Sequence, residues 1–217
     1  MAAPKPAFSR SPISHQVSRR QWLAGCASAL AGVALARAAA SAQQLPPQFG
    51  VPATPPCDPA TKPTPSRPAT GFRAGAPSRT RLTDPGEPGQ PLALTGAVIG
   101  LRCGVIAGAT LDVWQADAKG VADPTGMRLR GRQRTDAAGR YRVETIVPGS
   151  RGGHAPRLNV RVTVPGKATL TTSLFLPAAV AGDANARDKE FDPLLAMALV
   201  ERTAKALTAS FNVILDL

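Results

Sequence analysis

Residues 157–176, RLNVRVTVPGKATLTTSLFL, consist of two alternating segments separated by a Pro-Gly-Lys turn. In the first segment Leu158, Val160 and Val162 fall on one face, and polar side chains fall on the other. Side chains of a strand point alternately to its two faces, so this pattern is typical of a half-buried strand. The stretch therefore predicts a β-hairpin with one face in a hydrophobic core.

Five more segments of the same kind surround this hairpin. They cover residues 92–99, 109–116, 127–135, 140–147 and 211–217. Short alternating strands at this spacing predict an all-β fold, an antiparallel β-sandwich over residues 92–217. One short helix is expected near the C-terminus, within DPLLAMALVERTAKAL at 192–207, because Asp192 and Pro193 suit the N-cap and the first helical position.

The first 42 residues have the features of an export signal. Arg19 and Arg20 precede an apolar, Ala-rich run over 23–36, and Ala-Ser-Ala follows at 40–42. A basic region, a short apolar run and a small-residue cleavage site define such a signal, and the twin arginines indicate the Tat pathway. The alternative, a membrane anchor, needs about 20 apolar residues. We therefore expect residues 1–42 to be removed, leaving a periplasmic or extracellular protein with no integral membrane span.

The net charge and the aromatic content of the chain indicate which kinds of partner it can bind. The whole chain carries +12, and the signal contains five basic and no acidic residues, so +7 remains after its removal. Nucleic-acid binding needs a basic face with stacking aromatic rings, but aromatic residues make up only 4% of the chain. We therefore expect no nucleic-acid partner, and we interpret the charge as favouring solubility and anionic ligands or surfaces.

Residues 43–91 form an extended, proline-rich arm, and its recurring prolines disfavour a helix or a central strand. The arm is either a disordered linker or an ordered segment that wraps the domain, and Cys57 and Phe72 favour the wrap. Cys57 and Cys103 are the two cysteines that remain after signal removal. An even pair in an oxidising compartment predicts a disulfide between them, and two separate thiols are the alternative.

Three segments carry a resemblance to a known family. They are DVWQADAKG at 112–120, RLRGRQRTDAAGRYRVETIVPG at 128–149 and LTTSLFLP at 170–177. They resemble the intradiol ring-cleavage dioxygenases of the catechol and protocatechuate type, which open aromatic diols with iron(III) and O₂. NARD at 185–188 and FDPLL at 191–195 resemble the exported branch of that family. The resemblance implies a β-sandwich enzyme with its iron held by two tyrosines and two histidines.

The four iron-ligand positions that the resemblance implies do not hold those residues here. The tyrosine positions are Ala122 and Arg151, and the two positions of the H-x-H motif are Arg157 and Asn159. The arginine that assists the substrate in the family corresponds to His154. All four ligands are therefore replaced, and we expect no iron cofactor.

Composition leads to the same expectation without any alignment. The chain contains two histidines and one tyrosine, and only His154 and Tyr141 lie beyond the signal. Two tyrosines and two histidines cannot be assembled from this set, and Tyr141 reads as a packed strand residue. A relocated metal site would have to combine His154 with acids such as Asp117 or Asp123, and their spacing does not favour one.

The sequence therefore predicts an exported, iron-free pseudoenzyme that acts as a binding protein or as a partner subunit of an intact homologue. Arg151, Arg157, Asn159 and His154 would converge and could bind a small aromatic or anionic ligand. The alternative is that the arginines pair with acids or turn to solvent. Two other functions stay open, namely an active Fe(III)-dependent dioxygenase acting on catechol-type substrates and a metal-free enzyme with His154 as acid or base.

The segment RLRGRQR at 128–134 has two interpretations. Arg128, Arg130, Arg132 and Arg134 would share one face of a regular strand, which would suit a polyanion. Because the segment belongs to the motifs that carry the family resemblance, we expect a solvated sheet face instead.

Overall fold

The computed structural model describes residues 62–102 and 104–217. The predicted signal at 1–42, the arm residues 43–61 and both cysteines, Cys57 and Cys103, lie outside the described residues. None of the helices in the described residues is long and apolar enough to cross a membrane.

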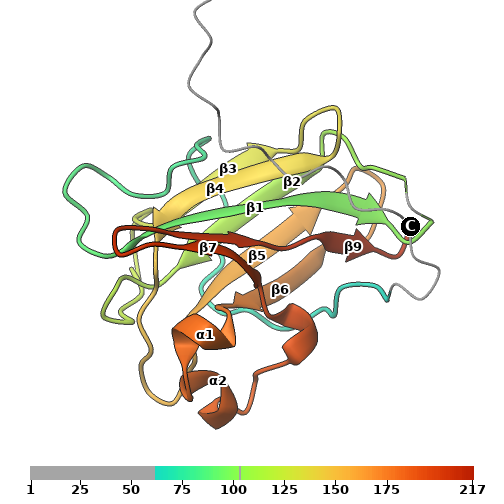
Figure 1. Ribbon diagram of the computed structural model, residues 1–217. Coiled ribbons are helices and arrows are strands. Elements are labelled where there is room, and N and C mark those ends of the chain that lie inside the picture. The colour runs from blue at the N-terminus through green and yellow to red at the C-terminus, as the bar shows by residue number, and fades with distance from the viewer. Residues whose placement is uncertain (1–61, 103) are drawn as a thin grey trace, which may run out of the picture. The chain divides into compact units, whose positions relative to one another are not determined.

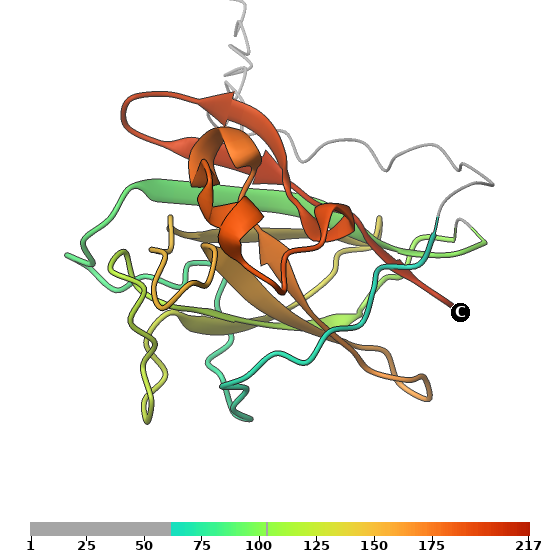
Figure 2. The same ribbon diagram turned by 90° about the horizontal axis from the view of Figure 1, so that it is seen from below.

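Two β-sheets pack face to face, as the alternating pattern predicts (Figures 1 and 2). The first sheet has the order β4-β1-β8-β7, with β9 also paired to β1, and the second has the order β3-β2-β5-β6. The strands of the first sheet are β1 (Pro91–Gly100), β4 (Arg140–Ile146), β7 (Ala198–Arg202), β8 (Leu207–Ser210) and β9 (Val213–Leu215). Those of the second are β2 (Thr110–Gln115), β3 (Arg130–Arg134), β5 (Arg157–Thr163) and β6 (Leu170–Phe175).

The core lies between the two sheets and is built from the inward side chains of each strand. In β5 buried and half-buried residues alternate, and Leu158, Val160 and Val162 are the buried ones. They pack with Leu94 and Val143 from the first sheet. Each such side chain stabilises the fold by about 1.5–3 kcal/mol when fully buried. The antiparallel sandwich and the β5–β6 hairpin predicted from the sequence are thus confirmed.

The short C-terminal helix predicted within residues 192–207 is wrong. Asp192 does cap a turn, since its carboxylate accepts a hydrogen bond from Leu194 N, but that turn is a single 3₁₀ turn, η1 (Pro193–Leu195). The chain then forms β7 and β8, and β8 pairs in parallel with Leu92–Thr95 of β1. This pairing buries Leu207 and Ala209 in the core. A partner far away in sequence therefore outweighs local helix propensity.

Short helices do occur, but they precede residues 192–207, where the sequence predicts a helix. They are α1 (Ala178–Ala181) and α2 (Ala184–Arg187), which Figure 1 places below β6 and β7. The edge strand β7 is exposed along its whole length, including Leu199 and Val200.

The described part of the proline-rich arm, residues 62–91, is ordered and wraps the second sheet. Its first part bonds to β6 and β9, through Arg67 N to Thr171 O and Thr64 N to Ile214 O. Its later part bonds to the other edge, through Arg79 N to Arg132 O of β3. The cyan and teal trace in Figure 1 passes behind the sheet between these points. The arm thereby covers open strand edges, which would otherwise pair with other chains.

Candidate functional site

A row of side chains crosses the outer face of the second sheet. Trp114 of β2 is in register with Arg130 on β3 and with Asn159 on β5, and Asn159 is in register with Ser173 on β6. Their neighbours along the strands point into the core, so these four side chains point the other way. They line a pocket of about 720 Å³, which we call the sheet pocket.

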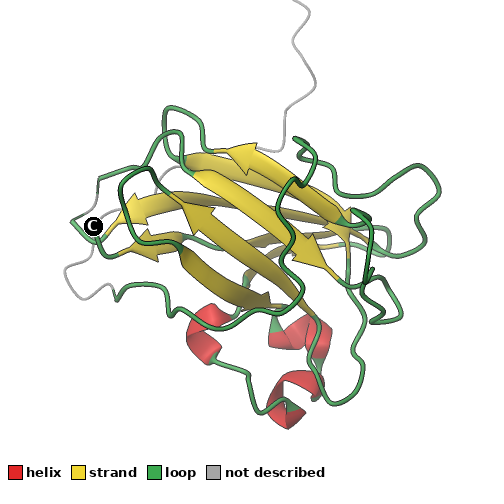
Figure 3. Cartoon of the chain, turned by 180° about the vertical axis from the view of Figure 1, so that it is seen from behind, coloured by secondary structure: helices red, strands yellow, loops and turns green. Residues whose placement is uncertain are grey.

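The arm forms one wall of the sheet pocket. Trp114 Nε1 donates a hydrogen bond to Thr70 O at 2.8 Å, and an Nη of Arg130 donates to Gly71 O at 2.6 Å. The ring of Phe72 meets that of Trp114 edge-on, with 5.6 Å between the centroids. Arg73 donates to Pro124 O in the loop between β2 and β3. Figure 3 shows loop segments crossing this face of the sheet. The proline-rich arm thus forms one wall of the pocket, and these contacts hold it in place.

The residues predicted to replace the iron ligands all line this pocket. Ala122 lies in the loop after β2, and Arg151 lies in the loop after β4. Arg157 and Asn159 come from alternate positions of β5, and His154 lies three residues before Arg157, where that strand begins. The structure therefore brings all five positions together around one cavity.

These side chains do not fit a ferric ion. Ala122 has no donor atom, and Arg151 and Arg157 are permanent cations that repel one. Asn159 Oδ1 accepts a hydrogen bond from Ser173 Oγ at 2.8 Å, and a neutral amide is a weak ligand for a hard metal. The donor set therefore supplies no anionic oxygen and no imidazole pair.

Tyr141 cannot supply a ligand either. It lies on β4 within the core, is 4% exposed, and donates its hydroxyl to Phe211 O at 2.7 Å. Burial raises the pKa of Tyr141 far above its usual value. The phenol is therefore a packed, neutral strand residue, as the sequence predicts.

Arg157 is neutralised by two acids that sequence reasoning missed. One Nη lies 2.7 Å from Glu190 Oε2 and 3.4 Å from Asp188 Oδ2, while the other Nη lies 3.0 Å from His154 Nδ1. The guanidinium also stacks over the ring of Phe175. Arginine can only donate, so His154 Nδ1 accepts this hydrogen bond and the proton of the neutral ring sits on Nε2. The alternative that the arginines pair with acids therefore holds for Arg157.

The side chains around Arg157 include a set with metal-binding chemistry. Ligand atoms of His154, Asp188 and Glu190 all lie within 4.8 Å of one another. The guanidinium of Arg157 contacts all three, so a cationic group already lies among these donors. The sequence did hint at this arrangement, because an arginine on a half-buried strand needs an acidic partner and the segment 183–192 is rich in acids.

Asp188 is the anchor of this cluster. Its side chain is 2% exposed, and its carboxylate accepts hydrogen bonds from Ala155 N at 2.7 Å and Glu190 N at 2.9 Å. It thereby ties the start of β5 to the segment after α2. A buried carboxylate with these partners fixes where Arg157 and His154 lie.

Asp117 and Asp123, the acids considered for a relocated metal site, accept hydrogen bonds from other groups. Asp123 accepts hydrogen bonds from the backbone of Gly126, Arg128 and Thr125, and these bonds lower the pKa of its carboxyl. Asp117 is partly buried, which raises its pKa, but hydrogen bonds from Val121 N and the Arg128 guanidinium outweigh burial and lower it. Neither carboxylate belongs to the cluster at His154.

The arginine segment 128–134 does not form one regular face. Leu129 has a φ of 54° and separates Arg128 from β3. Arg128 pairs with Glu87 and Asp117, Arg132 pairs with Asp112, and Arg134 is exposed. The predicted solvated sheet face is therefore wrong for Arg130, which is buried at 4% exposure and lines the sheet pocket.

Arg130 is unusual because no carboxylate of the described residues lies within ion-pair distance of it. Its two Nη atoms donate to the backbone carbonyls of Gly71 and Asp123, and its Nε is buried without a hydrogen-bond partner. Burial lowers the pKa of the guanidinium, the neighbouring charge of Arg73 lowers it further, and the charge of Asp123 only partly offsets these two effects. Two cations thus lie close together at the arm end of the pocket.

Comparison with known proteins agrees with this architecture. A sequence model of the family described as Dioxygenase matches residues 69–166. Catechol 1,2-dioxygenase 2 of Acinetobacter lwoffii is 32% identical over 129 residues, which cover 48% of this chain and 47% of that protein. The chain spans less than half the length of the curated relatives it matches.

Solved structures show the same β-sandwich. The dioxygenase domain of a dioxygenase carbohydrate-binding protein fusion from the cellulolytic bacterium Streptomyces sp. SirexAA-E has a TM-score of 0.67 and 36% identity, covering 72% of this chain and 99% of that one. The 3-chlorocatechol 1,2-dioxygenase of Rhodococcus opacus 1CP has a TM-score of 0.61 and 24% identity over 72% of each chain. These matches define a dioxygenase-type β-sandwich. The chain belongs to the intradiol ring-cleavage dioxygenase family.

Proposed function

We propose that this chain is an iron-free member of its family that binds a small molecule in the sheet pocket instead of oxidising it. One observation carries the proposal: Ala122, Arg151, Arg157 and Asn159, to which the family resemblance assigns the iron-ligand positions, line the pocket together. Ring opening with O₂ needs a metal, because O₂ reacts poorly with ordinary organic molecules and the cofactor carries the hard chemistry.

The shape of the pocket supports binding. Its volume of about 720 Å³ lies within the range of about 300–1,000 Å³ that small-molecule sites have. Trp114 and Phe72 give it aromatic walls, while charged side chains supply polar groups.

The rival enzymatic interpretations receive less support. An active dioxygenase would need ligands that these positions do not supply. A metal-free enzyme would use His154 as acid or base, but Nδ1 of that ring receives a hydrogen bond from Arg157. The role of a partner subunit for an intact homologue, export by the Tat pathway and the Cys57–Cys103 disulfide remain predictions from the sequence.

Oxygen uptake tests the proposed function. The full chain, incubated with Fe(III) and then with catechol or 3,4-dihydroxybenzoate, is expected to consume no more O₂ than buffer. A matched control is the variant with Ala122→Tyr, Arg151→Tyr, Arg157→His and Asn159→His, which restores the family's donor types. Catechol-dependent O₂ uptake by the unmodified chain would overturn the proposal.

A further inference from the structure

The positive charge in the sheet pocket is unevenly compensated. Arg157 has two acidic partners, Asp188 and Glu190. At the arm end, Arg130 and Arg73 donate only to backbone carbonyls. The acid at this end is Asp123, and its carboxylate is engaged by three backbone N–H groups. The arm end therefore carries two guanidinium groups for which no carboxylate of the described residues forms an ion pair.

Such an arrangement is costly unless something neutralises it. A buried charge without an opposite partner destabilises the folded state. Arg130 is 4% exposed, and its Nε has no hydrogen-bond partner. Arg130 lines the pocket and donates only to neutral carbonyl oxygens, so an anion bound in the pocket is the kind of group that would neutralise its charge.

We propose that Arg73 and Arg130 form a subsite for the carboxylate of a small organic acid, whose flat apolar body packs against Trp114 and Phe72. This inference rests on the proposed binding function and names its ligand class. The two rings meet edge-on beside the arginines and line the same pocket, so they contact any apolar group attached to the anion.

This subsite adjoins the loop at Ala122 but lies apart from Asn159. Arg130 lies on β3 and Asn159 lies on β5, with Trp114 of β2 between them. Adjacent strands are about 4.8 Å apart, so the two backbones are separated by roughly 10 Å. A bound acid would therefore hold its carboxylate at the arm end and extend its body across Trp114 toward Asn159.

Trp114 reports directly on binding. The chain has two tryptophans, Trp22 and Trp114, so a full-length Trp22→Phe variant leaves the pocket residue as the sole fluorophore of its kind. Benzoate is expected to change its emission saturably. Benzamide, which has the same shape without the charge, and inorganic phosphate, which has charge without the ring, are both expected to bind at least about tenfold more weakly.

Other outcomes of this titration overturn the proposal. Equal binding of benzamide would show that charge is not recognised, and equal binding of phosphate would show that no organic body is required. No response to benzoate, or a response to catechol alone, would also contradict it. Absence of iron in the same preparation is measured separately, so failure of this inference is distinguishable from failure of the proposed function.

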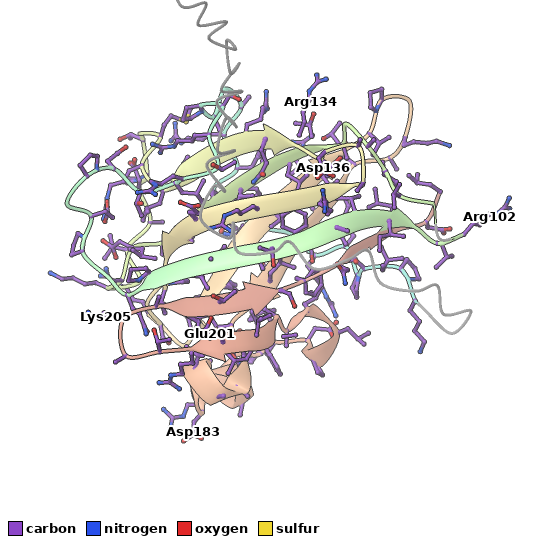
Figure 4. All side chains as sticks on the ribbon, turned by 45° about the horizontal axis from the view of Figure 1, so that its top comes forward. Arg102, Arg134, Asp136, Asp183, Glu201 and Lys205 are labelled. Atoms are coloured by element: carbon purple, nitrogen blue, oxygen red, sulfur yellow. The ribbon has the colours of Figure 1, made fainter. Side chains whose placement is uncertain are left out.

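Substitutions assign the binding to these residues. Arg73→Gln is expected to weaken benzoate binding about tenfold, because one of two charged donors is lost. Arg134→Gln is the matched control, since it removes the same charge from the strand that carries Arg130, and Figure 4 shows Arg134 pointing away from the sheets. Arg130→Lys keeps the charge but loses the forked donors, and it too is expected to weaken binding. Unchanged affinity in Arg73→Gln and Arg130→Lys would overturn the assignment.

Discussion

An Nη atom of Arg157 lies 2.7 Å from Oε2 of Glu190. The sequence resemblance assigns Arg157 to the first position of the family's H-x-H motif, where a side chain that binds a cation is expected, and Arg157 is itself a cation. Asp188 completes the arrangement from the buried side. The acids that neutralise this charge come from the segment after α2, which no motif of the sequence identified as part of the site.

Asp188 is expected to contribute more to stability than Glu190. Asp188→Ala removes a buried acceptor of Ala155 N and a partner of Arg157, so we expect a loss of about 2–4 kcal/mol. Glu190 is 60% exposed, and solvent screening limits the effect of Glu190→Gln to about 1 kcal/mol or less. Urea unfolding checks both. Asp183→Asn, at the exposed position that Figure 4 labels, is the control, and an equal loss in all three variants would contradict the account.

Removing Arg157 is expected to create a metal site. In Arg157→Ala the donor atoms of His154, Asp188 and Glu190 lose the guanidinium among them, and their spacing within 4.8 Å suits a zinc ion. Calorimetric titration with Zn²⁺ should show one site per chain in this variant and none at this cluster in the unmodified chain. The added substitution Glu190→Gln should weaken that site. Failure of Arg157→Ala to bind Zn²⁺ would show that the cluster is not held by the fold.

Tyr141 allows a clean alkaline test, because it is the one tyrosine in the chain. Burial raises its pKa, so the folded state favours the neutral phenol. The resulting stability is fully present below the unfolded pKa of about 10 and is lost as pH rises above it. Absorbance at the phenolate wavelength should therefore appear together with loss of near-UV circular dichroism. Ionisation of Tyr141 in a folded protein near pH 10 would contradict the buried placement.

Acid stability should depend on Asp192. The Arg67 guanidinium and then Leu194 N hold the pKa of Asp192 below its usual value. A depressed carboxyl pKa stabilises the fold above the unfolded pKa of about 3.9, and this stability is lost as pH falls through the folded pKa. Asp192→Asn retains a good N-cap but should flatten the fall in melting temperature below pH 4. Glu201→Gln on exposed β7 is the control.

Much of the fold could be predicted because it depends on local alternation. The strand at Leu158–Val162 and its hairpin partner follow from the alternation of apolar and polar residues, which is visible within that short stretch of sequence itself. The segment 198–210 could not be predicted in this way. Its strand β8 depends on parallel pairing with Leu92–Thr95, more than a hundred residues earlier, and a helical pattern gives no sign of that partner.

The candidate site likewise has features that the sequence predicts and features that it does not. The positions of Ala122, Arg151, Arg157 and Asn159 were predictable from motif spacing, and the structure gathers them in one pocket. The groups that interact with each arginine were not predictable from motif spacing, because the fold decides which charged and polar groups come close together. Arg157 forms an ion pair with Glu190. Arg130 lies on a strand that was expected to face solvent, but the arm covers it and accepts its hydrogen bond at Gly71 O.

The iron content of the full-length chain tests the central claim most directly. After incubation with Fe(III) and removal of unbound metal, the account predicts a colourless protein with far less than one iron per chain, while the variant restoring two tyrosines and two histidines serves as the positive comparison. A visible absorption band with one tightly bound iron per unmodified chain would contradict it.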